Sequence, residues 1–509
     1  MEKDNLFELI KSLNSSEKRY FKIFASRHSI GDKNKYLKIF DVYDKQKGYH
    51  EKNLQEELAK KNLSHNLKFN RHYLHKLILK SLQWYNSGQN TKSILAEQIN
   101  CIEILYNKGL LDQASRLLKK TQTLAHKYEY NNELVQLAFL ESKMMRTLSF
   151  VGVSQEDLHA FTAKSMSAVK NSYTEMEYEL FLIRLFHTIK KQGRARSESD
   201  KSELLVLGND KLLTQPGSNL PHRALWNYYF CKSAYHGLSK EYELAHSYGE
   251  KAIHLMEANP FQIKESPELY SLAISNNFEY MQMVGKTKRG LELLQKAQRL
   301  DIKAVIWKNR TNMWAGNLEL SAYTDNGAFD KAVMLAGQLE TKLINKELPG
   351  VQEESMIILY HHISIAHFGK GNYKEANKYL NKISNETPVK FRTDMHCFAR
   401  LLSLIIYYET GKADLLDYAS QSAQRFLKKN KRLFKLEQLF LAFMNKVNKD
   451  GGSAQKKDFI QLLSAVSPLT HDKLENTAFE YFDYVSWIES KIENKSFAEI
   501  IRRKRKIVL

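Results

Sequence analysis

The clearest structural signal in this sequence is Gly371-Asn372-Tyr373-Lys374-Glu375-Ala376, which continues at helical spacing through Tyr379, Leu380 and Ile383. A similar pattern of glycine, aromatic or leucine, and small residue recurs along the chain, although Lys240 replaces the glycine in one copy. The glycines, which we use as anchors, are Gly109, Gly285, Gly327, Gly371 and Gly411, and the last four lie 42, 44 and 40 residues apart. Periods of 20 to 50 residues indicate a stack of repeated structural units.

Each part of the pattern has a physical reading. Glycine tolerates positive φ and therefore ends a first helix. The apolar residue two positions later packs into a helix pair, and the small residue five positions after the anchor allows close approach of the second helix. The small positions are Ala114, Ala245, Gly290, Ala332 and Ala376, and helix-ending prolines follow at Pro260, Pro349 and Pro388. The pattern predicts antiparallel helix hairpins.

These residues resemble the tetratricopeptide repeat, most closely over residues 357–388 and also over 225–260 and 307–349. The period exceeds the ~34 residues of that family, and most units lack its first-helix Trp and Leu-Gly pair. The resemblance implies an all-α fold, a right-handed α-α superhelix, that is, a solenoid of antiparallel helix hairpins. Gly152 and Gly193 lie near the expected positions of two further anchors.

The expected organisation has three parts. Residues 1–90 form a basic helical N-terminal module, 91–448 form the solenoid, and 449–509 form a C-terminal helical cap with a basic tail. The cap is expected to carry its aromatic residues, from Phe479 to Trp487, on one long helix. Atypical end modules are usual in such arrays because the terminal apolar faces must be covered.

The composition supports this interpretation. Only 7 Pro and 21 Gly occur among 509 residues, which disfavours β-rich and disordered structure. No apolar run reaches the ~20 residues of a membrane span, and the N-terminus has acidic residues where a secretory signal would be basic. We therefore expect a cytoplasmic protein. The cysteines Cys101, Cys231 and Cys397 are too far apart to predict a disulfide framework or a metal pair.

The net charge of +20 is concentrated near the two ends of the chain. Residues 1–90 carry 18 Lys and Arg against 10 Asp and Glu, residues 425–460 carry 10 against 3, and residues 500–509 carry 5 against 0. Two helices expected at 52–61 and 67–85 have the spacing of a helix-turn-helix, although the turn lacks its usual glycine. Candidate phosphate contacts are Lys68, Arg71, Lys76, Arg502, Arg503 and Arg505. A solenoid cap with a solvated basic face is the alternative.

No catalytic, cofactor-binding or metal-binding motif is evident. Gly285-Lys286-Thr287 lacks the earlier glycine of a phosphate-binding loop, and no carboxylate completes a zinc motif near His361, His362 and His367. Superhelical grooves bind peptides, and polar aromatic residues are favoured contacts. Candidate partner-binding residues on first helices are Tyr235, Trp314, Tyr360, His361, His367 and Tyr407. The sequence predicts a non-enzymatic scaffold binding a protein or peptide in the groove, or alternatively a nucleic-acid-associated regulator; it predicts no oligomeric state.

Overall fold

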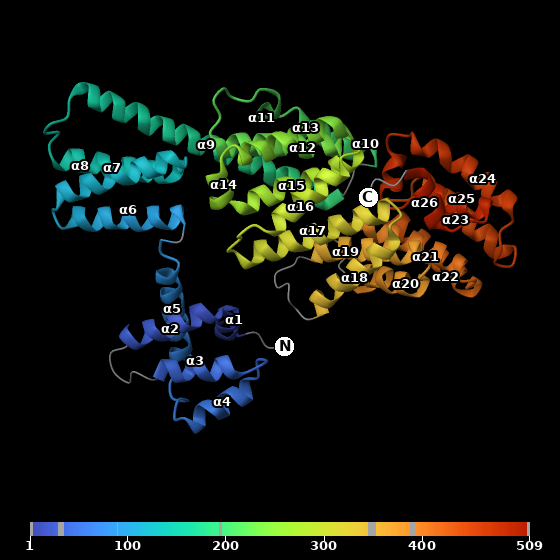
Figure 1. Cartoon of the computed structure of the whole chain (residues 1–509), viewed down its shortest axis with the longest axis horizontal. Helices are drawn as coiled ribbons and strands as arrows, with labels where there is room; N and C mark the ends of the chain where they lie inside the picture. The colour runs from blue at the N-terminus through green and yellow to red at the C-terminus, as the bar shows by residue number, and fades with distance from the viewer. Residues whose placement is uncertain are drawn as a thin grey trace. The chain divides into compact units, whose positions relative to one another are not determined.

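The computed structural model describes residues 4–28, 35–88, 90–192, 196–344, 353–386 and 392–505. Within them the chain forms helices and no strand (Figure 1). The chain divides into two compact units, Met1–Val169 and Lys170–Leu509, and the division falls inside one long helix, α9. The predicted all-α fold is confirmed.

The first unit contains two groups of helices. The first group surrounds one apolar core and comprises α1 (Asn5–Ser12), α2 (Ser15–His28), α3 (Lys35–Lys45), α4 (Glu51–Lys60) and α5 (Leu67–Tyr85). A second core lies among α6 (Thr91–Asn107), α7 (Leu111–Lys127), α8 (Asn131–Thr147) and the beginning of α9 (Gln155–Gln192). The helices expected at 52–61 and 67–85 therefore form close to those bounds, as α4 and α5.

The second unit begins within α9 and continues with short helices, then helix pairs. These are α10 (Glu198–Gly208), α11 (Lys211–Thr214), α12 (His222–Leu238), α13 (Tyr242–Glu257), α14 (Pro260–Glu265), α15 (Pro267–Met283), α16 (Thr287–Gln298), α17 (Val305–Asp325), α18 (Phe329–Ile344), α19 (Glu353–Gly369), α20 (Tyr373–Asn381) with the π-helical turn η1 (Lys382–Glu386), α21 (Thr393–Glu409) and α22 (Ala413–Lys429). The chain ends with α23 (Lys435–Lys449), α24 (Lys456–Val466), the 3₁₀ turns η2 (Ser467–Thr470) and η3 (Glu475–Glu480), α25 (Tyr484–Glu493) and α26 (Phe497–Arg505).

Consecutive helices pair as predicted. Contacts join α12 to α13, α15 to α16, α17 to α18, α19 to α20 and α21 to α22, and each first helix from α15 to α21 also contacts the next first helix. All five anchor glycines have φ between 64° and 81°, and Lys240 has φ 63°. Ala114, Ala245, Ala332 and Ala376 are fully buried, and a Cβ at Gly290 would lie 2.8 Å from the Phe278 ring. Small residues thus permit the close helix contacts.

Gly152 has φ 76°, like the anchor glycines, and the 38-residue α9 follows it after α8. One expectation is wrong. The C-terminal aromatic residues do not share one long helix, because η3 ends at Glu480 and α25 begins at Tyr484, where Asp483 accepts a hydrogen bond from the Ser486 amide. Gly193, Pro349 and Pro388 lie outside the described residues. The three-part division at residues 90 and 448 stays a prediction.

Candidate functional site

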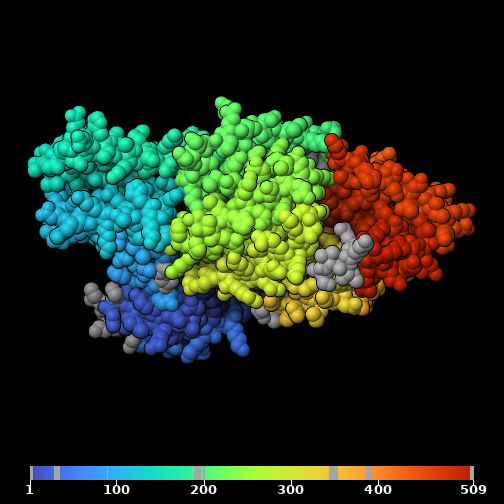
Figure 2. All heavy atoms as spheres, turned by 45° about the horizontal axis from the view of Figure 1, so that its top comes forward, coloured from blue at the N-terminus to red at the C-terminus, as the bar shows by residue number. Residues whose placement is uncertain are grey.

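Residues 472–482, which we call the internal segment, contact elements that are far apart in the sequence of the second unit. Figure 2 shows the C-terminal residues against the helices of this unit. The middle and the end of the segment are buried: Thr477 is 0% exposed and Phe482 is 3% exposed. Its contacts join the turn between α12 and α13 to residues of α19 and α21.

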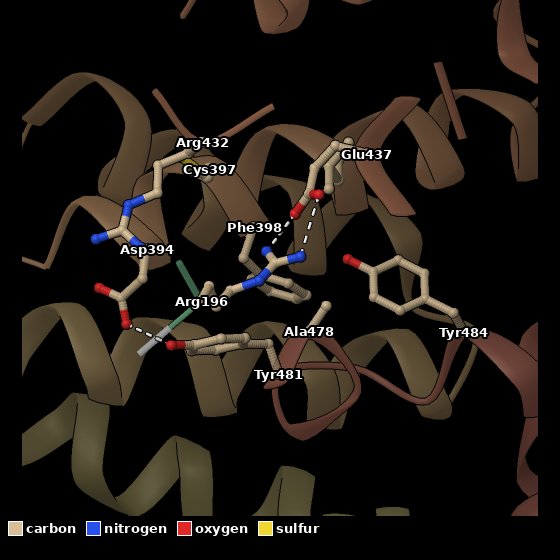
Figure 3. Close-up of a pocket in the computed structure, with 10 residues that line it drawn as sticks. Arg196, Asp394, Cys397, Phe398, Arg432, Glu437, Ala478, Tyr481 and Tyr484 are labelled. Atoms are coloured by element: carbon tan, nitrogen blue, oxygen red, sulfur yellow. Dashed lines mark hydrogen bonds and ion pairs between the residues drawn. The ribbon is translucent and has the colours of Figure 1, made fainter. Parts of the chain in front are cut away.

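Arg196, which precedes α10, makes the most buried ionic contact of this region. Its guanidinium donates to Glu437 of α23 (Figure 3), and its Nη2 lies 3.1 Å from Glu475 Oε2 in the internal segment. Arg196 is 8% exposed and Glu437 is 2% exposed, and the guanidinium also lies 4.3 Å from the centroid of the Phe434 ring. Glu475 additionally accepts a hydrogen bond from the Lys435 amide at the start of α23. One arginine therefore joins the beginning of the unit to its end.

A second set of contacts surrounds Tyr481. Its hydroxyl donates to Asp394 Oδ2 at 2.6 Å, and its carbonyl accepts from His361 Nε2 at 3.0 Å. Asp394 is held between Tyr481 and Arg392, whose Nη2 donates to the carboxylate at 2.7 Å. Although burial opposes ionisation, the charge of Arg392 and these hydrogen bonds lower the pKa of Asp394. The carboxylate is thus a structural anion.

Lys240 explains why one repeat anchor is not glycine. Its ammonium donates to Asn476 and Thr477 of the internal segment, and Tyr242 donates to Glu480 at 2.8 Å. A lysine at φ 63° is strained, since left-handed backbone costs a non-glycine residue about 1 kcal/mol or more. These hydrogen bonds offset that strain.

A small cavity remains beside these contacts. Its lining includes Arg196, Asp394, Arg432, Glu437 and Tyr481 (Figure 3). The volume of the cavity that the centre of a water molecule can reach is about 20 Å³. One water molecule needs about 10–15 Å³ on the same measure. The cavity therefore suits one or two waters and is too small for an organic substrate. Within the described residues, no group of three or more His, Cys, Asp or Glu side chains is arranged to hold a metal ion.

The candidate partner-binding residues are buried or half-buried. His361 is buried against Tyr481 and Phe398. Tyr360 and His367 both pack on Tyr379 of α20, inside their own hairpin. The other three are also half-buried: Tyr235 packs over Gly208, Trp314 lies beside Arg310, and Tyr407 packs against the core around α21.

The candidate phosphate contacts also differ from one another. Lys68 and Lys76 are exposed on α5, whereas Arg71 is ion-paired with Glu51 at 2.8 Å and lies 3.7 Å from Asp4. At the C-terminus, Arg503 is paired with Glu493 at 2.5 Å, and Arg502 donates to the Gly327 carbonyl at 2.9 Å. The side chain of Arg505 lies outside the described residues. Internal partners thus engage three of these arginines.

The outer face of α5 combines basic and aromatic side chains. Phe69 is 64% exposed and Trp84 is 56% exposed, with Tyr73 and three lysines between or beside them. The helix contains no Asp or Glu. Asn62 and Asn66, at φ 58° and 53°, provide the left-handed residues that the turn between α4 and α5 needs in place of glycine.

A second exposed surface, absent from the sequence predictions, lies on α9. Tyr173, Met176, Leu180 and Ile183 are 64%, 56%, 53% and 56% exposed, and we call these four residues the α9 row. Met166 and Val169 continue the same spacing earlier on the helix, at 62% and 45% exposure. Large apolar side chains are rarely exposed as a contiguous group unless something binds there. The alternating spacing of three and four residues was the available sequence signal.

Comparison with known proteins does not assign this site. No protein-family model matches the sequence, and no curated protein shows detectable similarity to it.

Proposed function

We propose that this chain is a cytoplasmic, non-enzymatic scaffold of tetratricopeptide-like helix hairpins that binds a protein partner. The observation that carries the proposal is the α9 row, in which four large apolar side chains, each more than half exposed, follow one another along a helix. Contiguous exposed apolar surface is typical of protein-protein interaction sites.

The groove expected from the sequence is a weaker candidate for the partner site. The internal segment buries Thr477 and Phe482 and is held by the ion pair between Arg196 and Glu475. A peptide that bound His361 or Asp394 on the first helices would have to displace this packed segment, with loss of its buried contacts. We therefore assign the partner to the α9 row.

A pull-down with matched variants tests this function. The tagged chain is compared with a Met176→Lys/Leu180→Lys variant, and with a Leu205→Lys/Val206→Lys control that changes two similarly exposed residues of α10, 58% and 74% exposed. A partner retained by the parent chain and the control, and lost from the α9 variant, is the expected result. Retention by all three proteins would refute the assignment.

A second candidate function is nucleic-acid binding through α5. It is favoured by the exposed Lys68, Lys76 and Lys80 on a helix without acidic residues, beside the exposed Phe69 and Tyr73. Lysines that contact phosphates contribute to affinity in a salt-dependent manner. Fluorescence anisotropy with a labelled duplex should show weaker binding by Lys76→Glu/Lys80→Glu but not by Lys428→Glu/Lys429→Glu. Equal binding by both variants would exclude α5 as the contact.

A further inference from the structure

One side of α5 carries exposed aromatic rings together with exposed lysines. These side chains are separated by four, three, four and four residues, a spacing that places them along one face of the helix, and we call them the α5 stripe: Phe69, Tyr73, Lys76, Lys80 and Trp84. The face that contains Leu74 and Ile78 is packed, since both are 0% exposed. Packing therefore accounts for the apolar residues of that face, and does not account for Phe69 and Trp84, which are more than half exposed.

The lysines of α5 have no carboxylate partner among the described residues. No ion pair there engages Lys68, Lys76 or Lys80, and α5 itself contains no Asp or Glu. Carboxylates elsewhere in this helix group are already paired: Asp4 and Glu51 with Arg71, Asp41 with Lys22, Asp44 with Lys18, and Glu57 with Lys60. The positive charge along the stripe is therefore left for a ligand, and a row of cations favours a ligand with repeated negative charges.

The aromatic rings distinguish a single strand from a duplex. The centroids of the Phe69 and Tyr73 rings lie 6.5 Å apart with their planes 22° from parallel, and the Tyr73 centroid lies 4.5 Å from that of Tyr36 in α3. Phe69, 64% exposed, is thus the open end of an aromatic group to which a further flat ring can be added. The bases of a single strand can stack on such rings, whereas the bases of a duplex are already stacked and paired with one another.

An anionic membrane would also attract the lysines, but its binding requires an apolar helix face that enters the lipid. The apolar face of α5, which includes Leu74 and Ile78, is buried in the core of the helix group. In the stripe, two lysines lie between Tyr73 and Trp84, so the exposed rings do not form a continuous apolar row. These features favour a strand of nucleotides, which presents both phosphates and flat bases.

We propose that the α5 stripe binds single-stranded nucleic acid, with bases stacked on Phe69 and Trp84 and phosphates at Lys76 and Lys80. The inference rests on the second candidate function, nucleic-acid binding through α5, and names the form of the ligand. Phe69 and Trp84 are 15 residues apart, which corresponds to about 22 Å along a helix. A strand with its bases about 3.4 Å apart covers that distance with roughly six nucleotides.

Fluorescence anisotropy with labelled strands tests the inference. The probes are an oligothymidylate and an oligouridylate of about 12 nucleotides, and a duplex of the same length. Lysines alone would favour the duplex, because its charge density is higher, so tighter binding of the parent chain to either strand than to the duplex is the expected result. Phe69→Ala and Trp84→Ala should each weaken single-strand binding by about tenfold and leave duplex binding within about twofold. The matched control is Phe139→Ala, which removes a 74% exposed ring of α8 in the same unit and should bind like the parent chain.

The contribution of charge is measured with Lys76→Gln/Lys80→Gln. This variant keeps the rings and loses two cations, so it should bind both the strands and the duplex more weakly. For the strands, the slope of log K against the logarithm of the salt concentration should become shallower by about 1.4, at about 0.7 for each phosphate contact. Phe69→Ala should keep the slope of the parent chain, since stacking releases no counterions. Circular dichroism verifies that all the variants are folded.

The inference and the function on which it rests can fail separately. Strand binding that is no tighter than duplex binding, or that is unchanged in Phe69→Ala and Trp84→Ala, would overturn the single-strand assignment. A duplex affinity that still depended on Lys76 and Lys80 would then leave nucleic-acid binding through α5 intact, whereas binding that none of these variants altered would remove both proposals. Binding to phosphatidylserine vesicles and to none of the nucleic acids would also overturn the inference and assign the stripe to a membrane surface. Preferred binding of either strand supports the inference, and the tighter strand identifies the sugar.

Discussion

Replacing Arg196 with methionine should strongly destabilise the second unit. The substitution keeps most of the side-chain volume but leaves Glu437, 2% exposed, beside Glu475 without their shared cation. Two unit charges 4 Å apart interact by about 4 kcal/mol at an effective dielectric constant of 20. Breaking a buried ion pair from one side costs about 3–5 kcal/mol. We expect the free energy of unfolding to fall by this amount.

The assay is thermal unfolding followed by the fluorescence of the tryptophans, including the fully buried Trp487. For a unit spanning Lys170–Leu509, an unfolding entropy of about 2.1 cal/mol/K per residue converts that loss into a fall in Tm of roughly 4–7 °C. The matched control is Arg184→Met, which removes an ion pair to Asp210 whose arginine is 57% exposed. Exposed pairs contribute about 0–1 kcal/mol.

The reasoning also predicts a rescue. Combining Arg196→Met with Glu437→Gln and Glu475→Gln removes the uncompensated charges and should restore most of the lost stability. Two results would contradict this reasoning: a fall in Tm for Arg196→Met no larger than that for Arg184→Met, or a triple variant as unstable as the single one. Either result would show that the ion pairs of Arg196 do not stabilise the unit.

Three further predictions follow from single residues. Burial lowers the pKa of His362 to about 4, so below pH 6.5 the unfolded state binds a proton that the folded state does not. The free energy of unfolding should therefore keep its full value above pH 6.5 and fall by on the order of 2 kcal/mol between pH 7.5 and 5. Urea unfolding at the two pH values should show a smaller loss for His362→Gln. Gly371→Ala should cost about 1 kcal/mol in urea unfolding because its φ is 81°, although no atom would obstruct the added Cβ. The same change at Gly337, exposed within α18 with no atom near the Cβ, should instead stabilise by about 0.5–1 kcal/mol, and equal signs at the two glycines would contradict the assignment of the anchors. Gly290→Ala should destabilise even though its backbone is helical, since the Phe278 ring lies 2.8 Å from the added carbon, and unchanged unfolding by urea would show that the ring moves freely.

Local rules made the helix hairpins predictable. Gly327 and Gly371 end first helices with positive φ, and Ala332 and Ala376 pack five positions later, so one period of sequence contains the information for one hairpin. The bounds of α5 are likewise predictable, because Leu74, Leu77 and Ile78 define a buried face at helical spacing.

The internal segment was not predictable by the same rules. Arg196 and Glu437 are 241 positions apart, and neither residue belongs to a motif that would connect them. Charge counts also misrepresent the C-terminal run. Arg503 and Lys504 add to its positive total, but the fold brings Glu493 and Glu489 to them at 2.5 and 2.6 Å. A run of cations in sequence is therefore not a free cationic surface when the preceding helix, here α25, supplies carboxylates.

The α9 row is the opposite case. Its spacing is visible in the sequence, but only the structure shows which of the apolar residues of α9 are exposed. Periodicity alone cannot separate its two apolar faces, since Phe181 and Leu180 are adjacent residues of one helix. The fold buries Phe181 completely and leaves Leu180 53% exposed, so the two sets acquire different roles. Packing explains why Phe181 is apolar and does not explain Leu180. If solubility alone governed this exposed face, polar residues would be favoured at these positions, and their apolar character is the reason for which we assign the proposed partner to this row.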